Sequence, residues 1–434
     1  MRAVLAVALC AAPLPSGAQT GPLPAATSAC VTLERAIALS LERDPRIGRA
    51  AAGARRAEAQ VRVERSNDRP QLSAFARSGF GEGGSIRADN QFDNRAGLRV
   101  SQRLYSFGRS QLAIGAAEQR AAGSRYGVRA AELEVVAEAS ERFLGIQRGE
   151  ERIAAAEAMS ADYERDLAQV DRRLEVGLIK LSEASGLRAE AARARARVVE
   201  ERLAVQQERT ALAAVTGAPA CIVAEPEQGM LVGRQPPSLQ VALDEADLNS
   251  PELSARAAEL SAARLDQRRE ARERLPDIGV SGVVAFDLAR NDPNLDGGRS
   301  SRLGLDITMP LYQGGRTAAR AAAAAGAAES LDFALRSERR LTAQEVEIAW
   351  IRTRELAPIA ELNGQTLAAL QAQAAATEQE YVNGLATLTE LIEVRRQEHQ
   401  GRLADIDARY ELMNERLRLL RLTARIVGIS GSTD

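Results

Sequence analysis

Two stretches of the 434-residue chain resemble loops that bind cofactors or metals. Residues 79–84 read GFGEGG and match the G-x-G-x-x-G pattern of a dinucleotide-binding loop, but polar residues 85–94 follow where that site needs a helix. Residues 292–297 imitate the start of a calcium-binding loop, yet Leu303 occupies the position of its bidentate glutamate. We therefore interpret both stretches as surface loops and expect no cofactor and no metal.

His399 is the only histidine, and we expect it on the polar side of the last helix. No serine or cysteine arrangement lies near it in the sequence, so a nucleophilic triad has little support. A single histidine is a weaker basis still for a metal site. The chain is therefore not expected to be an enzyme.

The N-terminus has the features of an export signal. A short positive start precedes the apolar residues 3–14, and small residues 16–18 follow, as before a cleavage site. We predict a signal peptide over residues 1–18. Leu9 stands where a lipoprotein signal needs a small residue before Cys10, so lipidation is not expected.

Two cysteines, Cys30 and Cys221, remain after the signal peptide is removed. In an oxidising compartment they could form a disulfide, or they could be two unrelated thiols. The sequence leaves both alternatives open.

The composition narrows the class of protein. Aromatic residues make up only 3% of the chain, and alanine, arginine, glutamate and leucine dominate, which favours long, closely packed helices. The net charge is −2 with arginine and glutamate interleaved, so no basic face for nucleic acid is indicated. After residue 18 no apolar run approaches the roughly 18 residues of a transmembrane helix.

Four runs of alternating residues predict β-strands. They cover residues 71–79, 96–105, 278–286 and 302–309. Each has about ten residues, the length that a tilted transmembrane strand requires. On the second run Leu98 and its even-numbered neighbours are apolar, whereas Arg99 begins a polar series on the opposite face.

Two similar hexapeptides link strand-like runs to long helical patterns. They read LYSFGR at residues 104–109 and LYQGGR at residues 311–316. The helical pattern after the first persists to about residue 176, or about 100 Å. We expect the glycines to give the backbone freedom for the change of direction and the tyrosines to lie at the depth of a membrane interface. The residues concerned are Tyr105, Gly108, Arg109, Tyr312, Gly314, Gly315 and Arg316.

The two halves of the chain repeat one plan. Landmarks recur at a nearly constant offset: Pro45 and Pro251, Pro70 and Pro276, Arg109 and Arg316, Gly177 and Gly384. This pattern predicts an internal duplication, with a first repeat at 31–217, a linker at 218–238 and a second repeat at 239–427. The last helix has a coiled-coil seam, which we expect to pack against the long helix that follows Arg316. The seam residues are Leu403, Ile406, Tyr410, Met413, Leu417 and Leu420.

Four strands per chain cannot cross a membrane as an open sheet, because the edge backbone groups would lack partners in hydrocarbon. We therefore expect several copies to close one barrel, and three copies give about twelve strands around a lumen. The alternative is a periplasmic coiled-coil scaffold or adaptor that never enters the bilayer.

The chain resembles the TolC-like outer membrane efflux proteins. The resemblance rests on the repeated strand, strand and long-helix halves, the duplicated hexapeptide, the helix start VTLERA, and the turns at Gly177-Leu178 and Gly384-Leu385. It implies an α+β membrane protein, in which a homotrimer forms a twelve-stranded barrel in the outer membrane of a Gram-negative bacterium, in contact with its lipid. A long α-helical coiled-coil tunnel would extend from the barrel through the periplasm.

The resemblance also implies partners and function. Such proteins are export ducts of tripartite efflux or type I secretion systems, and they work with a periplasmic membrane-fusion adaptor and an inner-membrane transporter of the RND or ABC type. The turn residues Gly177, Leu178, Gly384 and Leu385 are the expected contacts of the adaptor, since hairpin tips are what a partner helix can reach.

The same resemblance assigns a closed periplasmic entrance to Glu183, Tyr381, Glu390 and Glu393. Glu390 and Glu393 are three residues apart and project from one helix face. If that face lines a three-fold pore, their carboxylates should attract cations and raise one another's pKa. The basic residue usual in this lock is replaced by Ala386, and Lys180 is a candidate substitute.

Overall fold

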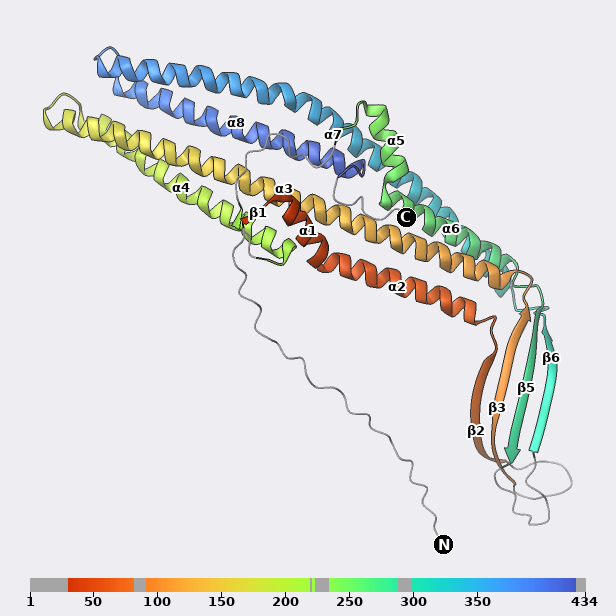
Figure 1. Cartoon of the computed structure of the whole chain (residues 1–434). Helices are drawn as coiled ribbons and strands as arrows, with labels where there is room; N and C mark the ends of the chain where they lie inside the picture. The colour runs from red at the N-terminus through yellow and green to blue at the C-terminus, as the bar shows by residue number, and fades with distance from the viewer. Residues whose placement is uncertain (1–29, 82–90, 219–220, 223–233, 288–298, 427–434) are drawn as a thin grey trace, which may run out of the picture.

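The computed structural model describes residues 30–81, 91–218, 221–222, 234–287 and 299–426. The predicted signal peptide and the calcium-like stretch at 292–297 lie outside these residues, as do residues 82–84 of the glycine-rich motif. Long helices run side by side along the molecule, and a small sheet bends away from one end of them (Figure 1).

The two halves contain the same elements in the same order. The first half consists of β1 (Cys30–Val31), α1 (Leu33–Arg43), α2 (Pro45–Ser66), β2 (Gln71–Gly81), β3 (Gln91–Tyr105), α3 (Arg109–Glu175) and α4 (Leu181–Thr216). The second half consists of β4 (Cys221–Ile222), α5 (Leu239–Asn249), α6 (Pro251–Ala271), β5 (Asp277–Asp287), β6 (Arg299–Thr308), α7 (Arg316–Val382) and α8 (Leu388–Leu422). The internal duplication is therefore visible in the fold as well as in the sequence.

Matching side chains start the matching helices. The Thr32 hydroxyl accepts a hydrogen bond at the start of α1, and Ser238 does the same for α5. At the next helix pair, Asp44 and Ser250 are the N-caps, and a proline occupies the first turn of each helix. The helices α3 and α7 both have 67 residues, about 100 Å, as the sequence pattern predicts.

The four longer strands form one antiparallel sheet in the order β2-β3-β5-β6. The contact between β3 and β5 joins the two halves, with Leu98 opposite Val284. Strand β3 begins at Gln91, five residues earlier than predicted, because it continues its pairing with β2 up to Gly81. The strands β2 and β6 are left as the edges of the sheet.

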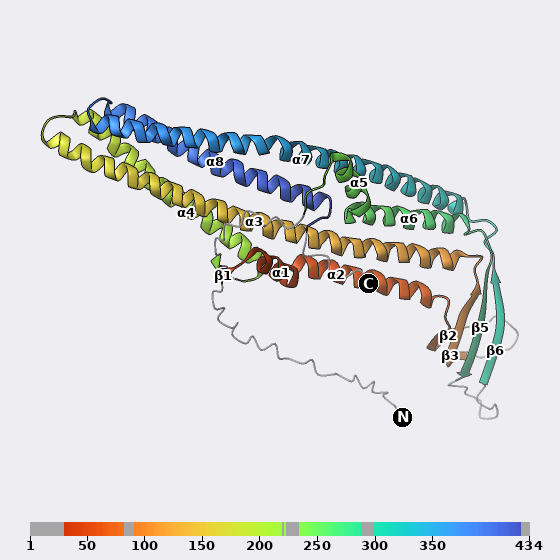
Figure 2. The ribbon, with the colours of Figure 1, turned by 45° about the horizontal axis from the view of Figure 1, so that its top comes forward.

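The helices follow the same lateral order as the strands. Helix α3 packs between α2 and α6, and α7 packs on the far side of α6 (Figure 2). Toward the other end, α4 lies along α3, and α8 lies along α7. One four-element layer therefore continues from the sheet into the helices. At the end far from the sheet, α4 and α8 take the places beside α3 and α7 that α2 and α6 have near the sheet.

Helix α8 lies along α7, as predicted, and its seam is buried, but the seam side chains pack mainly on other helices. Ile406, Tyr410, Leu417 and Leu420 belong to one buried cluster with residues of α1, α3 and α4, and no described residue of α7 belongs to it. Helix α7 instead packs on the neighbouring Leu419. The seam thus joins the two halves of the chain, because α1, α3 and α4 belong to the first half and α8 to the second.

Candidate functional site: strand-helix junctions and helix tips

Both junctions between strand and helix use two consecutive residues with left-handed backbone. In the first junction these are Phe107 and Gly108, with φ of 53° and 81°. In the second they are Gly314 and Gly315, with φ of 59° and 84°. Glycine adopts such angles at little cost, whereas an aromatic residue there is strained. The predicted role of the three glycines in the change of direction agrees with these angles.

The two junction arginines have different partners. Arg109 donates to the carbonyl of Pro276 at 3.4 Å and contacts Asp277 at 3.1 Å, so it ties the first junction to the start of β5. Among the described residues, the Arg316 guanidinium donates only to the side chain of Gln313, three residues before it, at 3.2 Å. Arg109 therefore links the first junction to the second half of the chain, whereas Arg316 makes no such link among the described residues.

The two junction tyrosines are exposed, Tyr105 at 54% and Tyr312 at 87%. The ring of Tyr105 packs edge-on against Phe107, with 4.7 Å between the ring centres, which offsets part of the strain there.

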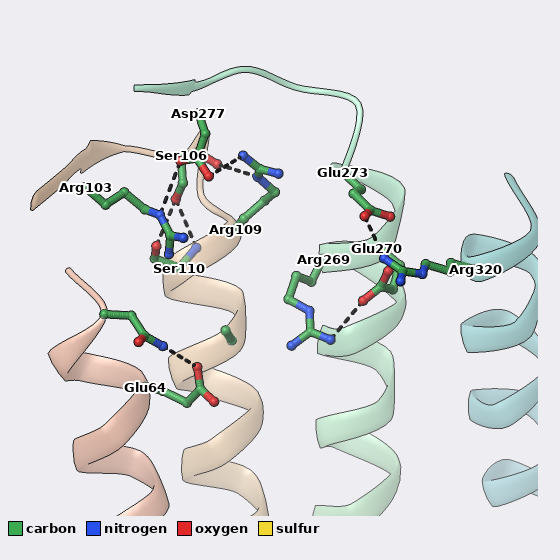
Figure 3. A pocket seen from close by; sticks show the side chains of 12 residues that line it. Glu64, Arg103, Ser106, Arg109, Ser110, Arg269, Glu270, Glu273, Asp277 and Arg320 are labelled. Carbon is green, nitrogen blue, oxygen red and sulfur yellow. Dashed lines mark hydrogen bonds and ion pairs between the residues drawn. The ribbon is translucent and has the colours of Figure 1, made fainter. Parts of the chain in front are cut away.

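A cavity of about 220 Å³ lies at the first junction, where α2, α3, α6 and the start of α7 meet the sheet (Figure 3). Four arginines and four carboxylates line it: Arg103, Arg109, Arg269, Arg320, Glu64, Glu270, Glu273 and Asp277. Most of these charges pair with one another; Arg320 lies 2.8 Å from Glu273, and Arg269 lies 2.9 Å from Glu270. The cavity is thus a charge-balanced joint between helices and sheet. Two serines, Ser106 and Ser110, also line it, and their hydroxyls are hydrogen-bonded to each other at 2.9 Å.

The two helix tips are alike in structure. Gly177 and Gly384 both have a φ of 77°, and the amides of Leu178 and Leu385 donate back to carbonyls of the preceding helices at 2.9 and 2.8 Å. Such bonds end a helix with a left-handed glycine. Leu178 and Leu385 are 75% and 81% exposed. Both tips therefore present an apolar side chain to solvent, as the expected adaptor contact requires.

Glu390 has a structural partner that accounts for much of its position. Its carboxylate accepts hydrogen bonds from the amide and hydroxyl of Thr387, at 2.7 and 2.9 Å, and the Thr387 hydroxyl caps the helix in return. This capping box begins α8. The backbone hydrogen bond from Thr387 lowers the pKa of Glu390.

Glu393 is engaged in the same helix. It forms an ion pair with Arg396 at 2.6 Å and accepts a hydrogen bond from Gln397 at 2.8 Å. The bond from Arg396 lowers the pKa of Glu393, opposite in direction to the rise expected from a ring of carboxylates. That rise depends on three copies and stays a prediction.

The other two entrance residues lie close to the tips. Glu183 is in the first turn of α4, and Tyr381 is in the last turn of α7. Tyr381 is 4% exposed; it packs among apolar residues of both helical hairpins, with the Arg173 guanidinium 4.5 Å from its ring centre. Burial raises its pKa. In a single chain it therefore fastens the hairpins together.

A buried charged cluster between the hairpins was not predicted. Arg395 is 6% exposed and contacts Asp166 at 3.4 Å and Glu378 at 2.9 Å. Burial raises the pKa of Asp166 despite this arginine. His399 and Arg395 lie four and eight residues before Leu403, so they continue the seam toward the tip. Extending the seam through these polar residues would have predicted the cluster.

The predicted position of His399 on the polar side of α8 is wrong. The side chain is 3% exposed, and neither ring nitrogen has a hydrogen-bond partner among the described residues. Burial lowers its pKa to about 4, so at neutral pH it is uncharged and its 3.7 Å contact with Asp162 is not an ion pair. Helical spacing places it in the seam, and polarity alone gave the wrong face.

The two cysteines are neighbours in the backbone register. Strands β1 and β4 pair in parallel, with Cys30 opposite Cys221. Paired strands lie about 4.8 Å apart, within the range of Cα separations that a disulfide spans. The disulfide stays a prediction that this register favours.

The described residues offer little to metal chemistry. No group of three or more His, Cys, Asp and Glu side chains within these parts of the chain is placed to hold a metal ion. None of the helices in the same parts is both long and apolar enough to cross a membrane.

Comparisons with known proteins agree with this geometry. The family model described as outer membrane efflux protein matches residues 36–218 and 242–425, one stretch in each half. No curated protein sequence matches the chain. Among solved structures, a membrane protein from Pseudomonas aeruginosa is 21% identical, with a TM-score of 0.82, and the match covers 91% of this chain and 93% of that one.

Two further structures have the same fold. The outer membrane protein VceC of Vibrio cholerae is 17% identical, with a TM-score of 0.80 and coverage of 91% of this chain and 96% of that one. The MtrE outer membrane channel of Neisseria gonorrhoeae is 18% identical, with a TM-score of 0.79 and coverage of 92% and 91%. At these identities the structures show a shared fold. Because the family model matches both halves over most of their length, the chain belongs to the outer membrane efflux protein family.

Proposed function

We propose that three copies of this chain close a twelve-stranded barrel in the outer membrane and continue it as a helical tunnel, which serves as an export duct. The family places the protein in the outer membrane and in efflux, a transport role and not an enzymatic one. The assembly and the export system are the proposal. One observation carries it: a four-stranded sheet with two unpaired edges is joined to helices of about 100 Å.

The internal repeat indicates how the edges are paired. Within the chain, β3 of the first half pairs with β5 of the second, with Leu98 opposite Val284. In the repeat, β6 corresponds to β3 and β2 corresponds to β5. Strand β6 of one copy would therefore pair with β2 of the next, in the same antiparallel sense, until the ring closes. Closure satisfies the edge groups that hydrocarbon cannot.

The helices support the same contact. Helix α3 packs on α6 within the chain, and the repeat predicts that α7 packs on α2 of the next copy in the same way. Arg316, whose guanidinium has no partner in the other half of the chain among the described residues, fits this arrangement. Arg109 donates to the carbonyl of Pro276, and its counterpart Arg316 would donate to the carbonyl of Pro70 in the neighbouring copy.

The two tips are proposed to receive the periplasmic adaptor, and the transporter of the inner membrane would deliver cargo through it. Exposed Leu178 and Leu385 lie at the far end of the helices from the sheet, where a periplasmic partner reaches them (Figure 1). Glu183, Tyr381, Glu390 and Glu393 are proposed to form the constriction next to these tips. Tripartite efflux and type I secretion both use such a duct, and the transporter would be of the RND or ABC type.

Membrane fractionation of cells that express the full chain tests the proposal. We expect the protein in the outer membrane fraction, and a trimer after mild detergent extraction. A soluble periplasmic monomer would refute the duct and favour the scaffold alternative. Cross-linking from a cysteine at Leu178 or Leu385, followed by mass spectrometry, would identify the adaptor; capture of no envelope protein from either tip would contradict the assigned contact.

A further inference from the structure

The two faces of the sheet differ sharply in chemistry. One face has exposed aliphatic side chains, namely Leu72, Leu98, Val100, Leu303, Leu305 and Ile307. The alternate positions of the same strands carry arginines, among them Arg77, Arg99 and Arg302. In the closed barrel of the proposed function the aliphatic face covers lipid. The arginines therefore face the lumen.

Arg99 and Arg302 lie in one row across the sheet. Arg99 of β3 is opposite Val283 of β5, and Val283 is opposite Arg302 of β6. Two strand spacings separate the arginines, or about 10 Å. The guanidinium of Arg99 lies 5.3 Å from the ring centre of Phe75 on the same face, which holds the charge in place.

Within the part of the chain that the structure describes, no carboxylate neutralises this row. Neither Arg99 nor Arg302 forms an ion pair with a carboxylate of the described residues, whereas Arg103 nearer the junction contacts Asp277 at 3.3 Å. Asp306 is on the same face as Arg302, but four residues closer to the junction. Toward the other end of the barrel, Arg77 is directly opposite Arg95, and Arg95 is in turn opposite Asp287 of β5. Among the described residues, the positive charge of this face is therefore concentrated at Arg99 and Arg302.

We propose that the row of Arg99 and Arg302 binds anionic groups inside the barrel, so that the duct favours anionic cargo. This rests on the proposed function, since only a closed barrel gives the row a lumen. A guanidinium offers paired N–H donors that match carboxylate and phosphate oxygens. Three copies repeat the row around one pore, where its field adds up.

The row acts separately from the carboxylates of the entrance. The length of α7 separates Glu390 and Glu393 from the barrel by about 100 Å. Charges so far apart are screened from each other, because the Debye length is about 8 Å at physiological ionic strength. A background with both glutamates changed to glutamine therefore isolates the selectivity of the barrel.

Planar bilayer recordings of the full-length protein test the row. In the Glu390→Gln, Glu393→Gln background we expect the chloride-to-potassium permeability ratio, from the reversal potential in a KCl gradient, to exceed one. Adding Arg99→Gln and Arg302→Gln should lower this ratio by about threefold or more, the effect of a lost potential of about one kT. Inositol hexakisphosphate added on the barrel side should block the pore, and the same change should weaken the block.

The matched control is Arg299→Gln, which removes the same charge from β6 but on the apolar face, opposite Phe286. It should leave both readouts unchanged, and lysine at 99 and 302 should retain them. An unchanged permeability ratio and block in the glutamine variant, or an equal loss in Arg299→Gln, would overturn the proposal. If the double variant does not assemble, Arg302→Gln alone is measured. A wild-type protein that forms no pore contradicts the duct itself, which separates the two failures.

Discussion

Replacing His399 with leucine should make the packing of the helices near the tips less sensitive to acid. The buried imidazole has a pKa of about 4, whereas an exposed histidine titrates near 6.5. Between pH 6.5 and pH 4, His399 therefore binds a proton when the helices open but stays neutral while they are packed. The contribution of the neutral His399 to the free energy of opening is fully present above pH 6.5 and is lost progressively as the pH falls toward 4.

The size of the effect follows from these two values. Between pH 7 and pH 5 the linkage amounts to about 2 kcal/mol, or on the order of a 25-fold rise in the opening constant. Other charged groups face this histidine in both proteins, and the rise in the pKa of Asp166, caused by burial, acts in the opposite direction. They are Asp162 and Asp166 on α3, Glu378 on α7, and Arg395, Glu398 and Arg402 on α8. Comparison of wild type with the leucine variant cancels their contribution.

Hydrogen exchange of the detergent-solubilised protein measures the opening. Peptides from α3 and α8 that flank Tyr163 and His399 are followed at pH 7 and pH 5, and the rates are corrected for intrinsic exchange. Wild type should lose protection at pH 5, and His399→Leu should keep it. The control Gln400→Leu makes the same change on the exposed side and should behave as wild type. Equal acid-induced loss of protection in wild type and His399→Leu would refute the reasoning.

Three further predictions concern the assembly, the entrance and the cysteines. Arg316→Ala should weaken each contact between copies by about 1.5–3 kcal/mol, the value of a hydrogen bond that involves a charged group, and lower the melting temperature of the trimer; a melting temperature equal to that of wild type would argue against the bond to a neighbouring copy. Glu390→Gln combined with Glu393→Gln should abolish cation preference and block by divalent ions in bilayer recordings, and unchanged selectivity and block would contradict a carboxylate ring. Non-reducing peptide mapping of protein from the periplasmic side should recover Cys30 linked to Cys221, and two free thiols there would exclude the disulfide.

Much of the architecture could be predicted because its signals lie between neighbouring residues and recur in both halves of the chain. Alternation fixed the four strands, the glycine pairs marked the junctions, and the offset between Arg109 and Arg316 revealed the duplication. Even the capping box was present in the sequence, since threonine precedes Glu390 by three residues. These features depend on neighbours in the chain, which a single sequence contains.

The charged cluster was missed because its cause is tertiary. His399 and Arg395 are polar, so hydrophobic periodicity alone predicts that they are exposed. In the structure both are buried between the two helical hairpins. Chain order predicted correctly that α8 lies along α7, but it did not reveal that the seam side chains pack on α1, α3 and α4 of the other half. The proposed contact of Arg316 with a neighbouring copy lies outside one chain, and only the repeat indicates where it would be.

The length of α3 and α7 gives the tips mechanical leverage. A rigid helix of 67 residues is a lever arm of about 100 Å that pivots at its junction. A tilt of about 5° there would carry the tip sideways by about 9 Å, comparable to the width of a helix. An opening at the tips thus needs only a small rotation at Gly108 or Gly315, and the barrel can stay still while it happens.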